Sequence, residues 1–475
     1  MADTALWTVD ELLAATKGKL HGSVTKPLNA VTIDSRAVGQ GDIFVAIKGE
    51  RHDGHDFVAG ALKAGAGLGL VSRVTPDMTS AGPVLEVADD PLRGLENMGL
   101  AARARSHAQI IAVTGSVGKT STKEMLSVAL GATGQTHASA ASFNNHWGVP
   151  LTLARMPRET AFGVFEIGMN HGGEITPLVG MVRPHVAIVT TIAASHLGHF
   201  NSLDGIADAK AEIFTGLLPG GYAVISRDTP YFDRLTAAAK ACGVTSIVSF
   251  GKHPDSDVRM DRVVLHPECC CVTATVMGET LIYKLGVPGE HMAVNSLAVL
   301  AAVKLAGADL ARAALALAAA QPAKGRGVRE TLSFGSGELL LIDESYNANP
   351  ASVGAALALL GASKPGKGGR RVAVLGDMLE LGEQGPALHA GLFEAMDAAS
   401  VDVLYAAGPL MANLWARVPD AKRGAHAATA DGIHEALLSG LKPGDVVMIK
   451  GSLGSRMGPL VEAIKAAHPP RGKET

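Results

Sequence analysis

Short apolar runs alternate with glycine-rich turns and with amphipathic stretches along most of the chain. Apolar runs of roughly four to eight residues between turn signals are typical of buried strands, whereas apolar positions that recur about every 3.6 residues are typical of helices. Residues 31–66 accordingly predict a strand, a loop, a second strand, a glycine-rich loop and a helix. The amphipathic stretch 89–107 predicts a helix that leads into a second domain.

The next part of the chain repeats a strand-then-helix order, which favours a parallel sheet covered by helices on both faces. Farther on, residues 257–284 alternate between apolar and polar positions and predict antiparallel strands, and residues 292–305 predict a helix with an Ala and Leu face. The apolar runs that predict the parallel strands are 109–113, 161–168, 185–192, 222–228 and 245–251.

A turn-rich segment, 322–327, separates this region from a third one, in which the strand-then-helix order restarts. This order predicts a separate doubly wound sheet. Its expected strands are 337–345, 370–378, 401–408 and 445–452. The length of 475 residues accommodates three domains at roughly 150 residues each.

Composition narrows the class of protein. Apolar residues make up 47% of the chain and charged residues 18%, so the chain can bury sizeable cores. The net charge is −3, and no block of like charges suggests binding to nucleic acid or an anionic membrane. Neither a signal peptide nor an apolar run long enough to span a membrane is present, which predicts a cytoplasmic protein. Three of the four cysteines, Cys269–Cys271, are adjacent, which excludes a disulfide framework or a spaced zinc site.

The strongest chemical signal is TGSVGKTS, residues 114–121, which ends a buried strand and opens a helix. Backbone N–H groups of such a loop point at one spot, and the helix dipole adds positive potential there, so the loop suits phosphate. Lys119 is placed to reach the β- and γ-phosphates of a nucleotide, and the Thr120 hydroxyl to bind Mg²⁺. Only two residues separate the first glycine from Gly118, where the usual motif has four, so a chance match on a surface loop is the alternative.

Three further side chains follow predicted strands or lie on a predicted helix. Glu166 ends an apolar strand at the edge where parallel sheets bind ligands and suits Mg²⁺; a strand-end ion pair is the alternative. His196 follows the next strand and is either a site residue or a surface histidine. Lys210 falls on the apolar stripe of a helix expected at 203–218, which should lower its pKa. The neutral amine could take up CO₂ to form a magnesium-binding carbamate; a snorkelling lysine or a buried ion pair is the alternative.

Several segments, in order and spacing, resemble the Mur ligase family along essentially the whole chain. They are DSRAVGQGDIFVAIKG with DGH, TGSVGKTSTKEM, SFNNHWGVPLTL, FEIGMNHGGEI, DAKAEIF, GEHMAVNSLA, DESYNANP and LGDMLELG. The resemblance implies an α/β protein of three domains. These are a small N-terminal α/β domain for the uridine substrate (1–88), a central P-loop ATPase-like parallel sheet (89–328) and a mobile C-terminal Rossmann-like domain (329–475).

The resemblance also assigns residues. ATP is expected at Thr114, Gly115, Ser116, Val117, Gly118, Lys119, Thr120, Ser121, Asn295, Arg326 and Asp343. Mg²⁺ is expected at Thr120, Glu166, His196 and a carbamylated Lys210, and the expected catalytic residues are Lys119, Glu166, Lys210 and His196. The substrates are expected at Ser35, Arg36, Asn144, Asn145, Tyr346, Asn347 and Asn349. The chain departs from the family pattern at Met292, where many relatives have Asn, and at His146 and Trp147.

The implied reaction joins a carboxylate to an amine with the help of ATP. The carboxylate of UDP-N-acetylmuramoyl-tripeptide attacks the γ-phosphate, which gives an acyl phosphate and ADP. The amine of D-alanyl-D-alanine then displaces phosphate, which yields a peptidoglycan precursor. We expect a monomer that has these two substrates and neither a nucleic-acid partner nor a membrane span; the third residue of the acceptor peptide, diaminopimelate or lysine, stays open.

Two classes of alternative function stay open. One is another ligase. A Mur ligase that adds diaminopimelate or lysine is expected to carry an Asp-Asn-Pro-Arg motif in the last domain, which this sequence lacks, and a folylpolyglutamate synthetase should lack the N-terminal domain. The other is a P-loop protein that hydrolyses ATP only to change shape, which would not need Lys210 or a dipeptide site. Dependence of phosphate release on both substrates distinguishes these classes.

Overall fold

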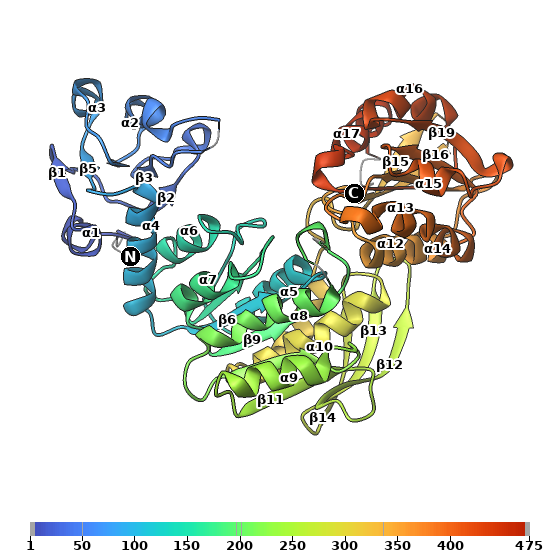
Figure 1. Ribbon diagram of the computed structural model, residues 1–475, viewed down its shortest axis with the longest axis horizontal. Helices are drawn as coiled ribbons and strands as arrows, with labels where there is room; N and C mark the ends of the chain where they lie inside the picture. The colour runs from blue at the N-terminus through green and yellow to red at the C-terminus, as the bar shows by residue number, and fades with distance from the viewer. Residues whose placement is uncertain (1–4, 50, 196, 201, 336, 471–475) are drawn as a thin grey trace.

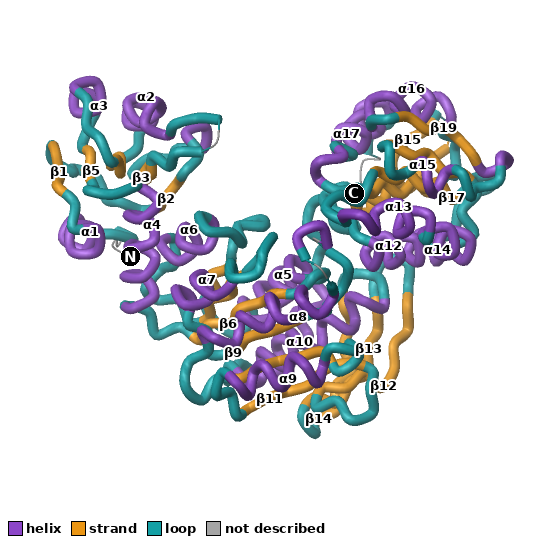
Figure 2. The backbone as a smooth tube through the Cα atoms, viewed as in Figure 1, coloured by secondary structure: helices purple, strands orange, loops and turns teal. Residues whose placement is uncertain are grey.

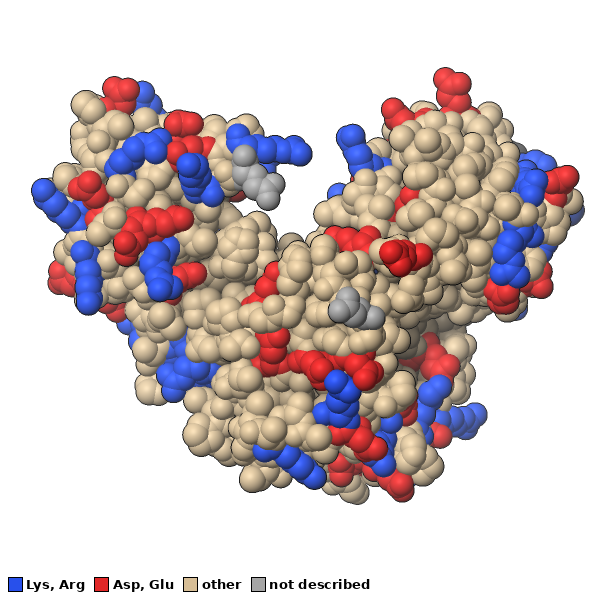
Figure 3. All heavy atoms as spheres, in the orientation of Figure 1, with Lys and Arg blue, Asp and Glu red and all other residues tan. Residues whose placement is uncertain are grey.

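The chain folds around three separate β-sheets, each covered by its own helices (Figures 1 and 2). The computed structural model describes residues 5–470 except residues 50, 196, 201 and 336. We call the three parts the N-terminal, central and C-terminal lobes, after the sheets in chain order. The outer lobes stand on opposite sides of the central one, and Figure 3 shows a broad notch between them. Within the described ranges, no helix has the length and apolar character that crossing a bilayer requires.

The N-terminal lobe contains a sheet with the strand order β1-β5-β4-β3-β2, parallel except for β1. Its strands are β1 (Lys19–His21), β2 (Ala30–Thr32), β3 (Asp42–Val45), β4 (Leu68–Val71) and β5 (Val84–Glu86), and its helices are α1 (Val9–Thr16), α2 (Val58–Ala64) and α3 (Pro76–Ala81). Thr8 and Glu11 fix the start of α1, because each side chain accepts the other's backbone N–H. The order of elements predicted for residues 31–66 is confirmed.

Helix α4 (Pro91–Ala104) joins the N-terminal lobe to the central one, as predicted for residues 89–107. Asp90 accepts the N–H of Leu92 at its start, and a proline occupies its first position. Its apolar face packs together with the first sheet and with α6 (Gly148–Ala154) in one buried cluster. The helix therefore belongs to the packing of both lobes.

The central lobe contains a nine-stranded sheet with the order β14-β13-β12-β11-β10-β9-β6-β8-β7. Neighbours from β7 to β12 are parallel, and β12, β13 and β14 pair antiparallel, which confirms both predictions for this region. The strands are β6 (Gln109–Thr114), β7 (Thr136–Ala138), β8 (Phe162–Glu166), β9 (Val186–Val189), β10 (Tyr222–Ser226), β11 (Ser246–Gly251), β12 (Val258–Leu265), β13 (Cys270–Val276) and β14 (Glu279–Leu285).

Helices cover both faces of this central sheet, as an inner parallel sheet requires. One face packs against α5 (Lys119–Gly131), α10 (Glu290–Leu305) and α11 (Leu310–Ala316). The other packs against α6, α7 (Ile175–Val182), α8 (Leu203–Ala211) and α9 (Phe232–Ala241). The strands between the two layers are apolar almost throughout, because both of their faces are buried.

The helix expected at 203–218 is shorter than predicted. Helix α8 ends at Ala211, and the chain continues as a 3-10 segment, Glu212–Gly216. Gly216 lies directly against α7, where a Cβ atom would be 2.5 Å from the carbonyl oxygen of Val179. The Glu212 carboxylate accepts the N–H of Gly173 at 2.6 Å, just before α7. These contacts draw the chain toward α7, and helical spacing alone does not reveal them.

The C-terminal lobe contains a six-stranded sheet with the order β15-β16-β20-β17-β18-β19, parallel except for β15. Its strands are β15 (Val328–Phe334), β16 (Gly337–Glu344), β17 (Arg371–Gly376), β18 (Val403–Ala407), β19 (Arg423–Ala427) and β20 (Val446–Lys450). One face packs against α12 (Pro350–Ala362), α13 (Gly385–Ala390), α14 (Leu392–Ala398) and α15 (Ala412–Trp415), and the other against α16 (Ala430–Gly440) and α17 (Gly458–Ala467). The predicted doubly wound sheet is confirmed.

Candidate active site

A cavity of about 360 Å³ lies between the central and C-terminal lobes. The central lobe contributes the loop after β6 and the end of β8, and the C-terminal lobe contributes the segments that follow β16, β17 and β20. In both sheets these are the carboxyl ends of parallel strands, where open α/β sheets bind ligands. The cavity therefore brings two ligand-binding edges face to face.

The loop between β6 and α5 has the backbone that a phosphate loop needs. Gly115 and Gly118 have positive φ angles of +142° and +88°, a conformation that side chains disfavour. A Cβ atom at Gly115 would lie 2.0 Å from Thr190 Oγ1, and one at Gly118 would lie 2.6 Å from the side chain of Asn295. Neither position can carry a side chain without a rearrangement, and the side chain of Asn295 lies directly against the loop.

The loop is held in shape by the segment that follows β9. Ser116 donates its N–H to the carbonyl of Thr191 at 2.8 Å, and Thr190 Oγ1 donates to the carbonyl of Val117 at 2.6 Å. Lys119 folds over the loop and donates to the carbonyl of its first glycine at 2.7 Å. Burial lowers the pKa of Lys119, while the carboxylate of Glu166 acts in the opposite direction.

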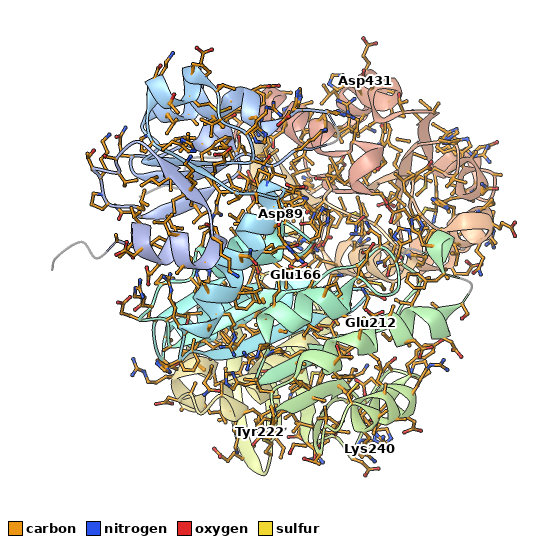
Figure 4. All side chains as sticks on the ribbon, turned by 60° about the vertical axis from the view of Figure 1, so that its left-hand side comes forward. Asp89, Glu166, Glu212, Tyr222, Lys240 and Asp431 are labelled. Carbon is orange, nitrogen blue, oxygen red and sulfur yellow. The ribbon has the colours of Figure 1, made fainter. Side chains whose placement is uncertain are left out.

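Glu166 ends β8 with a carboxylate that is surrounded by neutral donors. The side chain is 1% exposed, and Figure 4 labels it near the middle of the molecule. Thr120 Oγ1 donates to one carboxylate oxygen at 2.9 Å, and Asn144 Nδ2 donates to the other at 2.7 Å. No described lysine or arginine pairs with it. A buried carboxylate without a cation partner, next to a hydroxyl group, fits a site for Mg²⁺, which prefers oxygen ligands.

Lys210 lies on α8 and is 1% exposed, as its position on the apolar stripe predicted. Its ammonium group forms no hydrogen bond or ion pair with any described residue. Burial places the pKa of Lys210 well below its ordinary range, and nearby Lys119 lowers it further, although Glu212 and Glu166 oppose the shift. Burial therefore favours the neutral form of this amine over the ammonium form. The other residue expected near it, His196, lies outside the described residues.

The linker between the two lobes contributes Arg326. Its guanidinium lies 4.4 Å from the ring centroid of Tyr346, and it donates to Ser142 Oγ at 3.4 Å. Arg326 and Tyr346 line both the first cavity and a second one of about 670 Å³. Thr120 and Asp343 also line the second cavity. Asp343 lies one residue before the end of β16, and its carboxylate accepts a hydrogen bond from the hydroxyl of Ser345 at 2.6 Å. Apart from Thr114 and Gly115, the predicted nucleotide residues thus line one or both of these cavities.

The segment after β16 carries the residues expected to face the dipeptide. Tyr346, Asn347 and Asn349 all line the first cavity. Asn349 also caps α12, because its side chain accepts the N–H of Ser352 at 2.9 Å. Lys450, which we did not predict, donates to the carbonyl of Asn347 at 2.9 Å. Like Glu166, Lys450 is a charged residue at the carboxyl end of an apolar strand, VVMIK, so the same sequence argument could have identified it.

Some predicted residues do not line either cavity. Ser35 and Arg36 belong to the N-terminal lobe, where Arg36 is 88% exposed and pairs with Asp34 at 2.7 Å. Asn145 uses its side chain to accept the N–H of Gly148 at the start of α6. Thr114, Gly115 and Lys210 are buried behind the cavity walls, whereas Ser121 lines the first cavity.

Three models of Mur ligase domains match the chain: the Mur ligase middle domain over residues 113–303, the Mur ligase glutamate ligase domain over 330–453 and the Mur ligase family catalytic domain over 27–91. A UDP-N-acetylmuramoyl-tripeptide--D-alanyl-D-alanine ligase from Escherichia coli (strain K12) is 36% identical and covers 96% of this chain and 98% of its own length. A ligase of the same name from Bacillus subtilis (strain 168) is 32% identical and covers 96% and 97%.

Solved structures agree with these relatives. A crystal structure of MurF from Acinetobacter baumannii is 31% identical, has a TM-score of 0.83 and covers 97% of this chain and 99% of its own. A structure of MurF ligase from Thermotoga maritima in complex with ADP is 25% identical, has a TM-score of 0.73 and covers 92% and 97%. Because relatives at 36% and 32% identity extend over nearly the whole length, the chain belongs to the Mur ligase family.

Proposed function

We propose that the chain is an ATP-dependent ligase that joins D-alanyl-D-alanine to UDP-N-acetylmuramoyl-tripeptide through an acyl phosphate. The observation that carries the proposal is the single cavity in which a phosphate loop, a buried carboxylate and the Tyr346–Asn349 segment meet. Relatives that carry this name extend over nearly the whole chain. The names of these relatives identify the two substrates that we propose. The cavity has room where a phosphoryl group and an amine can react.

The phosphate loop accounts for the activation of the carboxylate. The N–H groups at the start of α5 and the Lys119 ammonium group would bind the β- and γ-phosphates, on which negative charge grows during transfer. A relative from Thermotoga maritima was solved in complex with ADP. When bound, Mg²⁺ neutralises charge on the phosphoryl oxygens. Thr120 and Glu166 would hold it with a hydroxyl and a carboxylate oxygen, and Asn144 orients Glu166.

We further propose that Lys210 is carbamylated in the active enzyme. Lys210 lacks a partner among the described residues, and burial favours its neutral form. In that form the amine can attack the carbon of CO₂, which forms an N–C bond and releases a proton to solvent. The carbamate would carry a negative charge and would offer a cation an oxygen ligand, as a carboxylate does. High-resolution density at Nζ, from protein prepared with bicarbonate, tests this directly. An ordinary ammonium group there, together with an active Lys210→Ala variant, would contradict the proposal; partial rescue of Lys210→Ala by acetate would support it.

The proposal assigns a separate role to each of the three domains, with limits at 1–88, 89–328 and 329–475. The N-terminal domain, with Ser35 and Arg36, binds the uridine part of the acceptor. The central domain activates the acceptor carboxylate. The C-terminal domain delivers the dipeptide through Asn347 and Asn349, and Asp343 binds the nucleotide ribose. Closure of this domain excludes water, which would otherwise hydrolyse the acyl phosphate.

A phosphate-release assay tests the proposed reaction. Release should require ATP, Mg²⁺, UDP-N-acetylmuramoyl-tripeptide and D-alanyl-D-alanine together, and mass spectrometry should detect the pentapeptide product. Acceptors ending in diaminopimelate or lysine are compared in parallel. Release that proceeds without the dipeptide, with no ligated product, would instead indicate an ATPase. Release with a free amino acid in place of the dipeptide would indicate a ligase of different specificity.

A further inference from the structure

Lys123 is a fully buried lysine next to the site, and the reaction described above does not use it. It lies on α5, one turn after Thr120, and is 1% exposed. Its ammonium group donates to the carbonyls of Ser139 and Ala141 at 2.8 and 3.0 Å and to the carboxylate of Glu124 at 2.5 Å. All three N–H donors are used, so the charge is compensated and the group is held in one place.

The two carbonyls belong to the loop 139–144, which contacts residues on two sides of the cavity. Ser139 Oγ accepts the N–H of Glu166 at 3.3 Å, and Asn144 Nδ2 donates to the carboxylate of Glu166 at 2.7 Å. Ser142 Oγ accepts from Arg326, the residue of the linker to the C-terminal lobe. This short loop therefore orients the carboxylate at the end of β8 and also contacts the linker.

The loop does not hold this shape by backbone preference alone. Ala141 has a φ angle of +45°, in the left-handed region. For a residue other than glycine this conformation is strained and persists only where surrounding contacts enforce it. The hydrogen bond from Lys123 to the carbonyl of Ala141 is such a contact. The ammonium group of Lys123 thus holds both the strained residue, Ala141, and Ser139 by their carbonyl groups.

We propose that Lys123 is a positioning residue for the ligase site: its ammonium group fixes the loop 139–144, and the loop fixes the carboxylate of Glu166 and the approach of Arg326. Lys123 lines neither of the two cavities. The inference rests on the proposed function for what the positioned groups do, but the arrangement itself belongs to the folded chain. Loss of Lys123 should therefore weaken Mg²⁺ binding more than it weakens dipeptide binding.

The main variant is Lys123→Met, which keeps the length of the side chain and removes its charge and donors. The Mg²⁺ concentration for half-maximal phosphate release should rise roughly 10–100-fold, as when a group that orients a metal ligand is lost. The KM for D-alanyl-D-alanine should change little. A second readout needs no turnover: with ADP present, the Mg²⁺ concentration that gives half of the rise in melting temperature should shift in the same direction.

Lys304 offers a matched control. Its ammonium group donates to the carbonyls of Val276 and Met277 and to the carboxylate of Glu279, and Met277 also has a left-handed φ angle, +47°. This arrangement is less buried and lines neither cavity. Lys304→Met should lower the melting temperature while leaving both Mg²⁺ midpoints unchanged. The comparison of the two variants therefore distinguishes a general loss of stability from a specific loss of Mg²⁺ affinity at the site.

The double variant Lys123→Met with Ala141→Gly tests the proposed route. Glycine adopts the left-handed conformation without the cost that alanine bears, so the double variant should recover part of the lost Mg²⁺ affinity. If Lys123→Met does not fold, Lys123→Leu replaces it, because leucine also has neither a charge nor a donor for the two carbonyls. Midpoints equal to the wild type in the folded variant would overturn the inference.

The two proposals fail separately. If the wild type binds Mg²⁺ and ADP but releases no phosphate with the two substrates, the substrate assignment fails, and a shifted ADP midpoint in Lys123→Met still supports the inference. If the wild type is an active ligase and both Lys123→Met midpoints are unchanged, the positioning role is wrong and the proposed function stands.

Discussion

Lys123 and Lys210 are equally buried residues of the central lobe, but they differ in what surrounds the ammonium group. Lys123 donates to three oxygens, one of which belongs to the Glu124 carboxylate. Lys210 has no partner among the described residues, and burial favours its neutral form. A buried polar group without a partner destabilises the fold. The first environment suits a structural cation, and the second suits a reactive amine.

The pH dependence of stability should reveal the state of Lys210. Lys210→Met should stabilise the ligand-free protein near neutral pH by roughly 1–3 kcal/mol, because it removes a buried group without a partner. The pKa of Lys210 is lowered by folding, so between that lowered pKa and 10.5 the unfolded chain binds more protons than the folded one. Wild-type stability therefore rises with pH in this window, and its gap to the variant narrows. Urea unfolding in CO₂-free buffer measures the difference in unfolding free energy between the variant and the wild type. A difference that widens as the pH rises would contradict a lowered pKa for Lys210.

Lys119→Ala should nearly abolish ligation without affecting the fold. Phosphate release should fall by roughly 10²–10³-fold or more, the usual loss when one charge-stabilising donor is removed. The free energy of unfolding should change little, because the ammonium group has one hydrogen-bond partner among the described residues, a loop carbonyl. Lys240→Ala is the control: Figure 4 labels Lys240 at the outer surface, away from Glu166, and it should stay active. Near-normal turnover by folded Lys119→Ala would remove the phosphate-loop assignment.

Residues of the site differ in how far the sequence could predict them. Burial of Lys210 was predictable because its neighbours on the stripe, such as Ile206 and Ala207, have no exposed surface. Lys123 was not predictable, because its partners are backbone carbonyls 16 and 18 residues away, and carbonyls have no sequence signature. Lys450 at the end of an apolar strand was detectable by the argument applied to Glu166, but it lies outside the motifs that carried the resemblance.

Among the elements, the loop between β6 and α5 is the one whose backbone tolerates least change. Gly115→Ala should destabilise the protein by roughly 1–3 kcal/mol, because the side chain strains a φ angle of +142° and meets Thr190 Oγ1. Nucleotide affinity should fall with it, because the segment after β9 shapes the loop. Gly131→Ala, at the other end of α5, is the control: no atom lies within 4 Å of its Cβ position, and the change should stabilise by up to about 1 kcal/mol. Thermal unfolding and calorimetric titration with ADP distinguish the two.

Elements with a clear period were predictable, and their boundaries were less so. The alternation in 257–284 predicted the antiparallel strands β12 to β14 because one face of each is buried and the other is exposed. The stripe in 203–218 predicted a single helix, but the structure continues beyond Ala211 as a 3-10 segment. Apolar positions at helical spacing continue across that change, so the period could not locate it.

At the scale of the whole molecule, the two outer lobes are attached differently. The N-terminal lobe is joined to the central lobe by a buried hydrogen bond from Trp7 Nε1 to the carbonyl of Ala154 at 2.9 Å. A part-buried hydrogen bond from Arg155 to the carbonyl of Val31, at 2.6 Å, adds to it. The C-terminal lobe follows a turn-rich linker and faces the central lobe across the cavity. Residues 147 positions apart form the first of these contacts, so the sequence could not have predicted how the lobes are placed.

The C-terminal lobe should therefore move toward the central lobe when ligands bind, while the N-terminal lobe stays in place. Small-angle scattering should give a smaller radius of gyration with an unreactive ATP analogue, Mg²⁺ and the acceptor together than without them. Hydrogen exchange supplies the control within the same molecule: protection should increase in the linker 322–327 and the segment 344–349, and stay unchanged where α4 packs on α6. The physical reason is that a linker and a polar cavity resist rearrangement less than a buried apolar cluster does. Identical scattering profiles with and without ligands, or protection that increases between α4 and α6 instead, would contradict closure by the C-terminal lobe.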